Sequence, residues 1–274
     1  MDNYNIIKEI GKGSYGIVYL AKSKKSEREV IIKEVDLTSR IEKEKSKFMS
    51  GTMTENQMNQ NIKKFQDIVY NEISVLQKLC NCLELQDKKC LEHMSCFIDS
   101  FKDQNKIYIV QNYIEGLTYS QFAKYLKTNY KKEDKTLKIF LLKSMIGITK
   151  SVKYIHDRGV VHLDIHDENI IVESSNNFIL IDFGQACFLE EKYCLSYHTP
   201  TTEKHLIKFL KRVDLDLMGD MFQSILTIIY GRHWYRFFLG TDLEELLDSL
   251  ITDEPPSLDE VIDRLEYIIK RFST

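Results

Sequence analysis

The sequence lacks a long apolar run, an excess of basic residues and an N-terminal targeting signal. No apolar run approaches the ~18 residues that a membrane-spanning helix needs, and residues 1–5 show no charged region followed by an apolar one. Lys and Arg number 38 against 41 Asp and Glu, whereas nucleic-acid and membrane-surface binders usually carry a basic excess. We therefore expect a cytoplasmic monomer without nucleic-acid or membrane partners, in the host cytoplasm if the source is a virus or an intracellular parasite.

Cysteine is scarce, but four of the six cysteines lie close together. Cys80, Cys82, Cys90 and Cys96 fall in one short stretch with His93. A zinc site is conceivable, but the spacing matches no regular two-plus-two ligand pattern. Because cytosolic thiols are kept reduced, we expect inert thiols here, with zinc as the alternative.

Length and composition suit one packed unit with two lobes. For 274 residues the length prior is about two domains of ~150 residues, or one bilobal unit. Hydrophobic residues make up 43% and charged residues 29%, which is ordinary for a soluble protein with a packed core.

Two polar segments are joined by a predicted β-hairpin. Residues 161–169 read VHLDIHDEN, and DFG follows at 182–184. Between them, 170–172 and 178–181 predict two short strands separated by the turn-forming residues 174–177. Because a hairpin returns the chain to the start of its first strand, we expect the two polar segments to lie side by side.

The two polar segments contain three oxygen-bearing side chains that we expect to lie close together, Asp164, Asn169 and Asp182. Such oxygens suit magnesium-dependent phosphoryl transfer. The spacing matches the H-R-D-x-x-x-x-N and D-F-G motifs of protein kinases, so the chain resembles a eukaryotic-type protein kinase catalytic domain. The resemblance implies that Asp164 is the general base and that Asn169 and Asp182 bind Mg²⁺.

The resemblance also implies an α+β bilobal fold. Residues 1–111 would form an N-lobe with a five-stranded antiparallel sheet and one main helix, 112–116 the hinge, and 117–274 a mostly helical C-lobe. A polar, helix-prone stretch at about 36–61 is longer than the family's usual connection. We expect it to be an inserted, solvated and mobile surface segment.

A glycine-rich segment lies near the N-terminus, at Gly11, Lys12, Gly13, Ser14, Tyr15 and Gly16. Glycines at these positions let a hairpin backbone approach phosphate oxygens. Dinucleotide folds use the same string but continue into a helix. Residues 17–20 are instead β-branched and aromatic, which favours a kinase-type hairpin over ATP.

Lys33 and Glu72 form the next expected pair. Lys33 ends the apolar strand 29–33, where the family has the lysine that binds the α- and β-phosphates. Glu72 lies on the apolar stripe of a helix predicted over 65–79. A buried carboxylate is costly unless it is paired, and Lys33 is the expected partner. The alternatives are a charged strand end and a glutamate that reaches solvent.

The resemblance further implies a set of residues around ATP: Val18, Ile31, Lys33, Gln111, Asn112, Ile114 and Ile171. The backbone of Asn112 and Ile114 would hydrogen-bond adenine, and Gln111 would be a polar gatekeeper. Ile31 stands where the family usually has alanine, which should narrow the pocket.

Two residues of the catalytic loop depart from the family pattern. Leu163 replaces the arginine that contacts a phosphorylated activation segment, so we expect activity without that phosphorylation. His166 replaces the catalytic-loop lysine near the γ-phosphate, and histidine is mostly neutral at pH 7. We therefore expect transfer that is slower or more pH-sensitive, with His166 still counted among the catalytic residues.

The C-terminal part matches the family more loosely. A helix is predicted over 139–155, and Asp214 should open an apolar helix at 221–229 and brace the catalytic loop. Glu203 would stand in for the glutamate of Ala-Pro-Glu, with Arg264 as its partner. This alignment puts Ser196 where Ser/Thr kinases carry a hydroxyl residue. Two helical patterns flank Pro255–Pro256 in a short C-lobe.

Three functions remain open on the sequence alone. The first is an ATP- and Mg²⁺-dependent Ser/Thr protein kinase acting on protein substrates. The second is a small-molecule kinase of the same superfamily. The third is a pseudokinase that acts as a nucleotide-binding scaffold, although the lysine, the base and the metal aspartate are all present.

Overall fold

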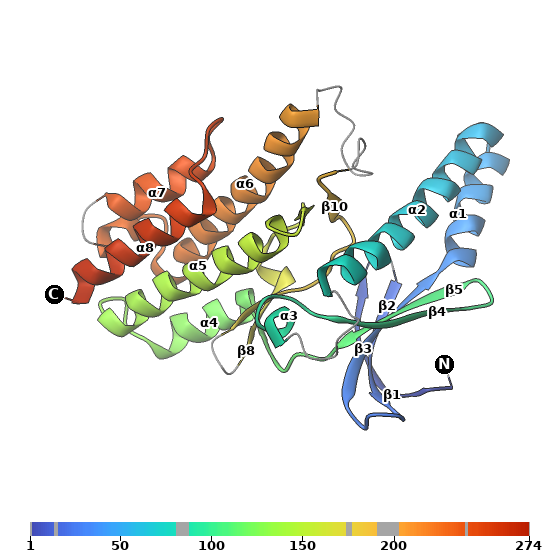
Figure 1. Ribbon diagram of the computed structural model, residues 1–274, viewed down its shortest axis with the longest axis horizontal. Coiled ribbons are helices and arrows are strands. Elements are labelled where there is room, and N and C mark those ends of the chain that lie inside the picture. The colour runs from blue at the N-terminus through green and yellow to red at the C-terminus, as the bar shows by residue number, and fades with distance from the viewer. Residues whose placement is uncertain are drawn as a thin grey trace.

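A computed structural model describes residues 2–13, 16–80, 88–173, 177–190, 203–238 and 241–273. The chain folds into two lobes, one built on a sheet and one mostly helical (Figure 1). The predicted α+β bilobal fold is confirmed. Among the described helices, none combines the length and the apolar character that a membrane crossing requires.

The N-lobe sheet has five antiparallel strands in the order β1-β2-β3-β5-β4. The strands are β1 (Tyr4–Gly13), β2 (Gly16–Ser23), β3 (Glu29–Asp36), β4 (Phe97–Asp103) and β5 (Lys106–Asn112). Successive side chains of a strand alternate between faces, so Ile32 packs with Val110 on one face while Lys33 and Ile109 point to the other. Lys33 is thereby directed toward the helix that covers the sheet.

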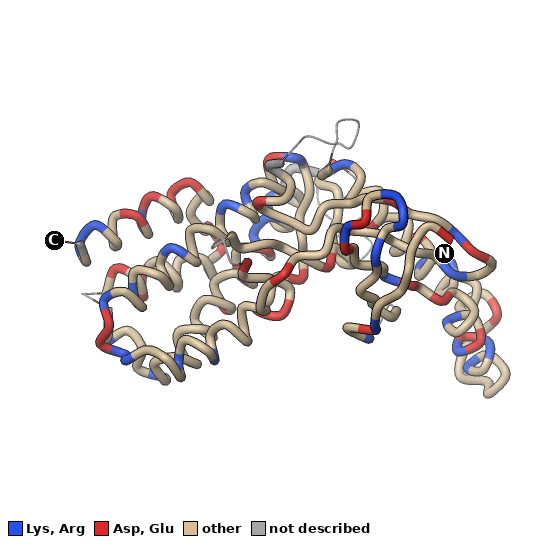
Figure 2. The backbone as a smooth tube through the Cα atoms, turned by 90° about the horizontal axis from the view of Figure 1, so that it is seen from below, with Lys and Arg blue, Asp and Glu red and all other residues tan. Residues whose placement is uncertain are grey.

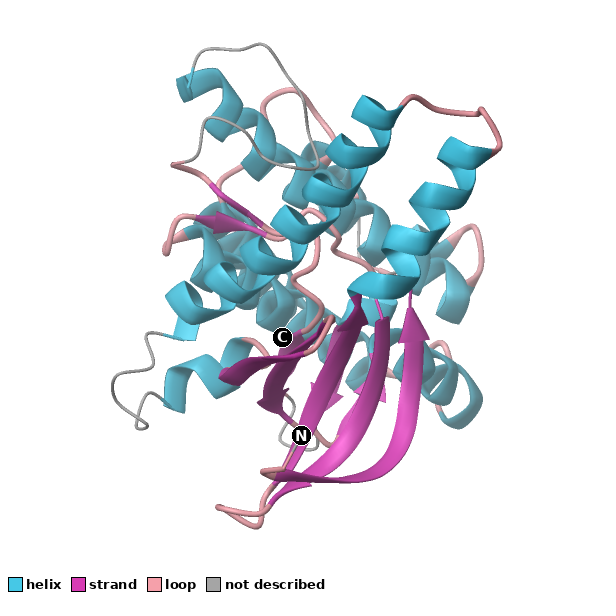
Figure 3. Ribbon diagram, turned by 90° about the vertical axis from the view of Figure 1, so that its right-hand side faces the viewer, coloured by secondary structure: helices cyan, strands magenta, loops and turns pink. Residues whose placement is uncertain are grey.

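Two helices stand where a solvated insertion was expected. They are α1 (Leu37–Met49) and α2 (Glu55–Cys80), which lie side by side (Figures 1 and 3). Glu44 of α1 is fully buried and accepts hydrogen bonds from Lys47 and Asn61. This network and the packing of Arg40 on Phe65 join α1 to α2. Most residues of 38–61 are nonetheless exposed, as expected for a solvated surface segment, and the mobility of the segment stays a prediction.

The C-lobe begins with a second, smaller sheet in the order β6-β8-β9. Its strands are β6 (Gly116–Thr118), β8 (Ile170–Glu173) and β9 (Phe178–Leu180), and a further pair joins β7 (Val160–Val161) to β10 (Cys187–Phe188). The predicted hairpin after the catalytic loop is thus β8–β9, with Ile170 opposite Leu180. It brings residues 161–169 beside 182–184.

Helices make up the rest of the C-lobe. They are α4 (Tyr119–Asn129), α5 (Lys135–His156), α6 (Glu203–Tyr230), α7 (Asp242–Leu250) and α8 (Leu258–Ser273), with short 3₁₀ turns at Asp167–Asn169 and Trp234–Phe237. A further short helix, α3 (Lys88–His93), precedes β4 in the chain and packs against α5 and β9. α5 buries Leu141, Leu142, Met145 and Ile148 in the main core. Charges of both signs are interspersed along both lobes (Figure 2).

α6 begins earlier than the sequence suggested. It runs unbroken from Glu203 to Tyr230, whereas the helix was expected to open at Asp214. Leu206 and Leu210, four residues apart, are buried in one apolar cluster, which extends the helix toward its N-terminus. Arg264 contacts the hydroxyl of Ser249, and the side chain of Glu203 lies outside the described residues, so the proposed pair stays a prediction.

The cysteines also differ from expectation. Cys90 and Cys96 form a disulfide, and Cys80 and Cys187 are buried cysteines outside it. The prediction of reduced thiols is therefore wrong for Cys90 and Cys96. Cys82 lies outside the described residues.

Candidate active site

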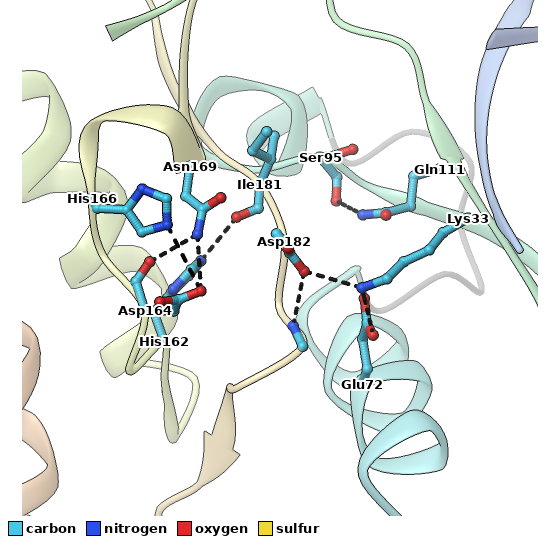
Figure 4. A network of polar contacts seen from close by, with 11 residues as sticks. Lys33, Glu72, Ser95, Gln111, His162, Asp164, His166, Asn169, Ile181 and Asp182 are labelled. Atoms are coloured by element: carbon cyan, nitrogen blue, oxygen red, sulfur yellow. Dashed lines mark hydrogen bonds and ion pairs between the residues drawn. The ribbon is translucent and has the colours of Figure 1, made fainter. Parts of the chain in front are cut away.

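Lys33 lies between two carboxylates from different lobes. Its Nζ atom is 2.8 and 3.0 Å from the two carboxylate oxygens of Glu72 and 3.1 Å from Oδ1 of Asp182 (Figure 4). β3 supplies the lysine, α2 supplies Glu72, and the segment after β9 supplies Asp182. Glu72 is only 3% exposed, so it is the buried partner of Lys33 and does not reach solvent.

The electrostatics of this cluster favour the charged forms of Lys33 and Asp182, whereas burial raises the pKa of Glu72 and the charge of Lys33 only partly opposes that rise. Burial alone would lower the pKa of Lys33, but the adjacent charges of Glu72 and Asp182 outweigh burial and raise it. Burial opposes ionisation of Asp182 too, yet Lys33 holds the pKa of this carboxyl below its ordinary value. Lys33 is therefore a cation at neutral pH, with Asp182 as an anion beside it.

The catalytic loop presents Asp164 next to Asn169. The amide Nδ2 of Asn169 donates to the backbone carbonyl of Asp164 at 3.0 Å and to its carboxylate at 3.1 Å. The amide oxygen of Asn169 is then the atom that it could offer to a cation. Asp182 uses Oδ1 for its contacts with Lys33 and the Gly184 amide, which leaves Oδ2 for the same purpose.

Asp214 braces the catalytic loop from α6. This fully buried carboxylate accepts hydrogen bonds from the backbone amides of His162 at 2.9 Å and Leu163 at 2.7 Å, and it lies 2.8 Å from Nε2 of His156. Leu163 has a φ of +60°, in the left-handed region that costs energy for a non-glycine residue. The two bonds to Asp214 flank this strained position and hold it.

His162 lies beneath the DFG segment as a neutral ring. Its Nε2 bonds to the carbonyl of Ile181 at 3.1 Å, and its ring packs on Phe183. Nδ1 is buried and has no hydrogen-bond partner among the described residues. Burial lowers the pKa of His162, because a second ring proton would have no acceptor there.

His166 points its ring toward the general-base position. The backbone amide of Glu168 donates to Nδ1 of His166 at 3.3 Å. In the neutral ring the proton is therefore on Nε2, which lies 3.9 Å from Oδ2 of Asp164. Both side chains are nearly half exposed. This Nε2–H group is a hydrogen-bond donor at the place where the family has a lysine.

A cavity of about 310 Å³ lies between the lobes beside these groups. Of the residues expected around ATP and the metal, its lining includes Val18, Ile31, Lys33, Gln111, Asn112, Ile114, Asn169, Ile171 and Asp182. Gly11, Lys12, Gly13 and Gly16 lie in the β1–β2 hairpin outside the lining, and Ser14 and Tyr15 lie outside the described residues.

The cavity also involves residues that the sequence analysis did not select: Ile10, Ser95, Tyr113, Gly116 and Ile181. Ile10 directly precedes Gly11 of the glycine-rich segment, and Ile181 directly precedes Asp182. Their positions next to these motifs could have indicated that they line the cavity. Ser95 has no motif beside it, and only the fold brings it to the cavity.

Two glycines are required by close backbone approaches. A Cβ on Gly16 would lie 2.0 Å from the carbonyl oxygen of Glu34 in β3, and a Cβ on Gly116 would lie 2.3 Å from that of Val172 in β8. A side chain at Gly16 would push the glycine hairpin away from the sheet. A side chain at Gly116 would separate the hinge from the floor of the cavity.

The back of the cavity is held by hydrogen bonds to Ser95 and Cys96. The Gln111 side chain is buried and donates to the carbonyl of Ser95 at 3.1 Å. The Asn112 amide donates to the carbonyl of Cys96, and the Ser95 hydroxyl donates to the carbonyl of Asn112. The backbone N–H of Asn112 is thus already used, while its carbonyl keeps one lone pair for a ligand.

α2 is fastened to the start of the activation segment. The Asn71 side chain donates to the carbonyl of Ala186 at 2.8 Å, and Lys78 lies over the ring of Phe188.

Leu163 belongs to an apolar cluster that links the catalytic loop, β10 and α6 and consists of Val161, Leu163, Cys187, Leu189, Leu206 and Leu210. Ser196 lies outside the described residues.

Lys33 is paired with Glu72 at a cavity between the lobes, and Asp164 lies beside the amide of Asn169. This arrangement is typical of the kinase class of phosphotransferases. The protein kinase domain family matches residues 71–205. Mouse serine/threonine-protein kinase Nek5 is 30% identical over 210 residues, which cover 75% of this chain and 27% of that relative. The chain belongs to the eukaryotic-type protein kinases.

Two other relatives have similar coverage. The probable serine/threonine-protein kinase nek2 of Dictyostelium discoideum is 25% identical over 83% of this chain and 49% of its own length. Serine/threonine-protein kinase D of Synechocystis is 30% identical over 67% of this chain and 30% of its own length. The chain thus spans less than half the length of each of these relatives.

Proposed function

We propose that the domain transfers the γ-phosphoryl group of ATP to Ser or Thr hydroxyls of protein substrates. In this proposal, Asp164 accepts the hydroxyl proton. Asn169 and Asp182 would hold Mg²⁺ through Oδ1 and Oδ2, and the bound cation would supply positive charge to the phosphate oxygens. Lys33 binds the phosphates that are not transferred. His166 donates from Nε2 to the transferred group.

The observation that carries the proposal is the position of Lys33. Its ammonium group is held by Glu72 and Asp182 at a cavity whose lining also includes Asn169. A lysine fixed between the lobes is ready to bind phosphate without a further movement of α2. This supports an enzyme that turns over rather than a scaffold.

The names of the relatives support a protein substrate, because those compared above are serine/threonine-protein kinases. Action in the cytoplasm and as a monomer stays a prediction from the sequence.

Labelled ATP with Mg²⁺ and the substrates casein, histone and a basic protein test the proposal. We expect label on Ser and Thr after hydrolysis of the product. Asp164→Asn should lower the rate by ~10²–10⁴-fold, the usual contribution of a positioned base. Lys33→Met should lower it as well.

Nucleotide binding measured on the same proteins separates the alternatives. Asp164→Asn should still gain thermal stability from MgATP, because Asp164 does not line the cavity. Native protein that binds MgATP without labelling any protein would contradict the proposal. Transfer to amino-alcohols or sugars in that case would point to a small-molecule kinase.

A further inference from the structure

Three cysteines from separate elements meet behind the hinge. Cys80 is the last residue of α2, Cys90 lies in α3, and Cys96 directly precedes β4. Their sulfur atoms all lie within 4.8 Å of one another. Cys80 and Cys90 are 4% and 2% exposed. The fold thus gathers three thiol side chains whose sequence spacing matched no regular pattern.

The surroundings of the Cys80 sulfur suit a thiolate. The backbone N–H of Phe97 donates to Sγ of Cys80 across 2.9 Å. A neutral thiol is a weak acceptor, and hydrogen bonds to charged acceptors are shorter and stronger. Hydrogen-bond donors of this kind commonly support the ligands of a metal ion.

The disulfide accounts for only two of the three sulfurs. It joins Cys90 to Cys96, and the Cys80 sulfur lies 3.5 Å from that of Cys90. A disulfide between Cys90 and Cys96 requires neither the nearby Cys80 sulfur nor the amide that donates to that sulfur. A thiophilic cation would use the Cys80 sulfur as a third ligand and the amide as a donor that supports this ligand. In a tetrahedral zinc site, Zn–S bonds of ~2.3 Å put sulfurs ~3.8 Å apart, close to the separation of the Cys80 and Cys90 sulfurs.

We propose that the reduced protein binds one thiophilic divalent cation of the Zn²⁺ type through Cys80, Cys90 and Cys96. A dithiol or phosphine reductant supplies two electrons, is itself oxidised, and converts the Cys90–Cys96 bond into two thiols. On binding, the three thiols release their protons and each sulfur donates an electron pair to the cation. Water takes the fourth tetrahedral position. The disulfide form is the oxidised, metal-free state.

The site would connect α2 to the hinge. Cys80 ends the helix that carries Glu72, and Cys96 is paired with Asn112 through two hydrogen bonds, one from each backbone amide. None of the three cysteines is among the residues that line the cavity between the lobes. The cation would therefore lie outside the site proposed for phosphoryl transfer and would link α2 to the hinge.

Cobalt is the probe for the test. The full chain, reduced with a phosphine under anaerobic conditions, is titrated with Co²⁺ and then with Zn²⁺. We expect one equivalent of Co²⁺ with the absorption bands of tetrahedral thiolate coordination, which disappear when Zn²⁺ displaces it. The single variants Cys80→Ser, Cys90→Ser and Cys96→Ser should each weaken binding at least tenfold. Cys187→Ser, a buried cysteine outside the cluster, should bind as the native chain does.

Alkylation gives a readout on the native protein if a variant fails to fold. Bound Zn²⁺ should protect Cys80, Cys90 and Cys96 from a thiol reagent, as measured by peptide mass spectrometry, and a chelator should remove the protection. The proposal is overturned if the reduced native chain binds no stoichiometric Co²⁺ or Zn²⁺. It is also overturned if the folded triple serine variant binds as tightly as the native chain.

Discussion

Asn71, the residue before Glu72, donates its side-chain amide to the backbone carbonyl of Ala186, which lies just beyond the DFG segment. The bond fixes α2 relative to the C-lobe without any modified residue. Since Glu72 is the neighbouring residue on the same helix, the bond also helps to hold the partner of Lys33 in place.

Removal of the Asn71 bond should impair catalysis more than folding. Asn71→Ala loses one hydrogen bond of ~1 kcal/mol, so we expect kcat to fall about fivefold with little change in Tm. Steady-state kinetics and thermal melts check this. The matched control is Asn129→Ala, because Asn129 makes a 2.8 Å bond to a carbonyl on the exposed face of α4. Equal losses in both variants would refute the argument.

Activity should survive phosphatase treatment. Leu163 stands where a phosphate-binding arginine would be, and it is buried among apolar side chains from β10 and α6. Packing in this cluster connects the catalytic loop to the activation segment without a phosphate. We expect phosphatase-treated and untreated protein to have the same rate within about twofold, with absence of phosphate verified by intact mass. A treated sample that has lost its activity would show that phosphorylation is needed.

Glu72→Gln should reduce kcat/KM by ~10–100-fold. The change keeps the shape of the side chain but removes the charge beside Lys33, and hydrogen bonds to charged groups contribute ~1.5–3 kcal/mol. Steady-state assays at varied ATP measure the loss. Glu254→Gln is the control, since its partner Lys208 and Glu254 itself are both exposed and surface pairs contribute little. Unchanged kinetics in Glu72→Gln would argue against the role of the pair.

His166→Lys should raise the rate of transfer. Lysine brings a full positive charge to the γ-phosphate, whereas the neutral histidine brings only the Nε2–H donor. We expect a gain of about three- to tenfold in kcat, the effect of ~0.7–1.4 kcal/mol of added charge stabilisation. His166→Gln keeps a donor without charge and should resemble the native enzyme. A lysine variant slower than both would show that this position does not contact the transferred group.

Stability should fall at acidic pH partly through His162. Burial lowers the pKa of His162 in the folded chain, while in the unfolded chain a histidine takes up a proton below pH ~6.5. The unfolded state then binds more protons, so the free energy of unfolding decreases as pH falls through that value. We expect Tm to drop more between pH 7.5 and 5.5 in the native chain than in His162→Gln. Parallel melting curves for the two proteins would exclude this contribution.

Motifs with a fixed chemical purpose were predictable from the sequence. The order of Lys33, Asp164, Asn169 and Asp182 along the chain was sufficient to predict the fold and the proximity of these side chains, while their roles in phosphoryl transfer stay predictions. The β8–β9 hairpin followed from a turn between two short apolar runs.

Features that depend on contacts between distant segments were not predictable. The burial of Glu44 depends on Asn61 from the next helix, and the charge pattern of this largely exposed stretch gave no sign of it. The early start of α6 depends on a cluster with Leu163, some forty positions earlier. Tertiary packing of this kind overrides local propensity.

The prediction for the cysteines was wrong for a similar reason. Their spacing was compared with regular ligand patterns, but α2, α3 and the start of β4 are what bring Cys80, Cys90 and Cys96 together. Ser95 belongs to a segment with no motif, and it lines the cavity between the lobes only because the fold brings that segment there.

The length of α2 gives its far end leverage over the catalytic lysine. Glu72 is seventeen residues from the N-terminal end of the helix, and at 1.5 Å per residue the intervening arm is about 26 Å long. A tilt of about 10° around the N-terminal end of α2 would displace Glu72 by roughly 4–5 Å. Because Glu72 lies 2.8 Å from the Lys33 ammonium, the ion pair requires α2 to keep its orientation along its whole length.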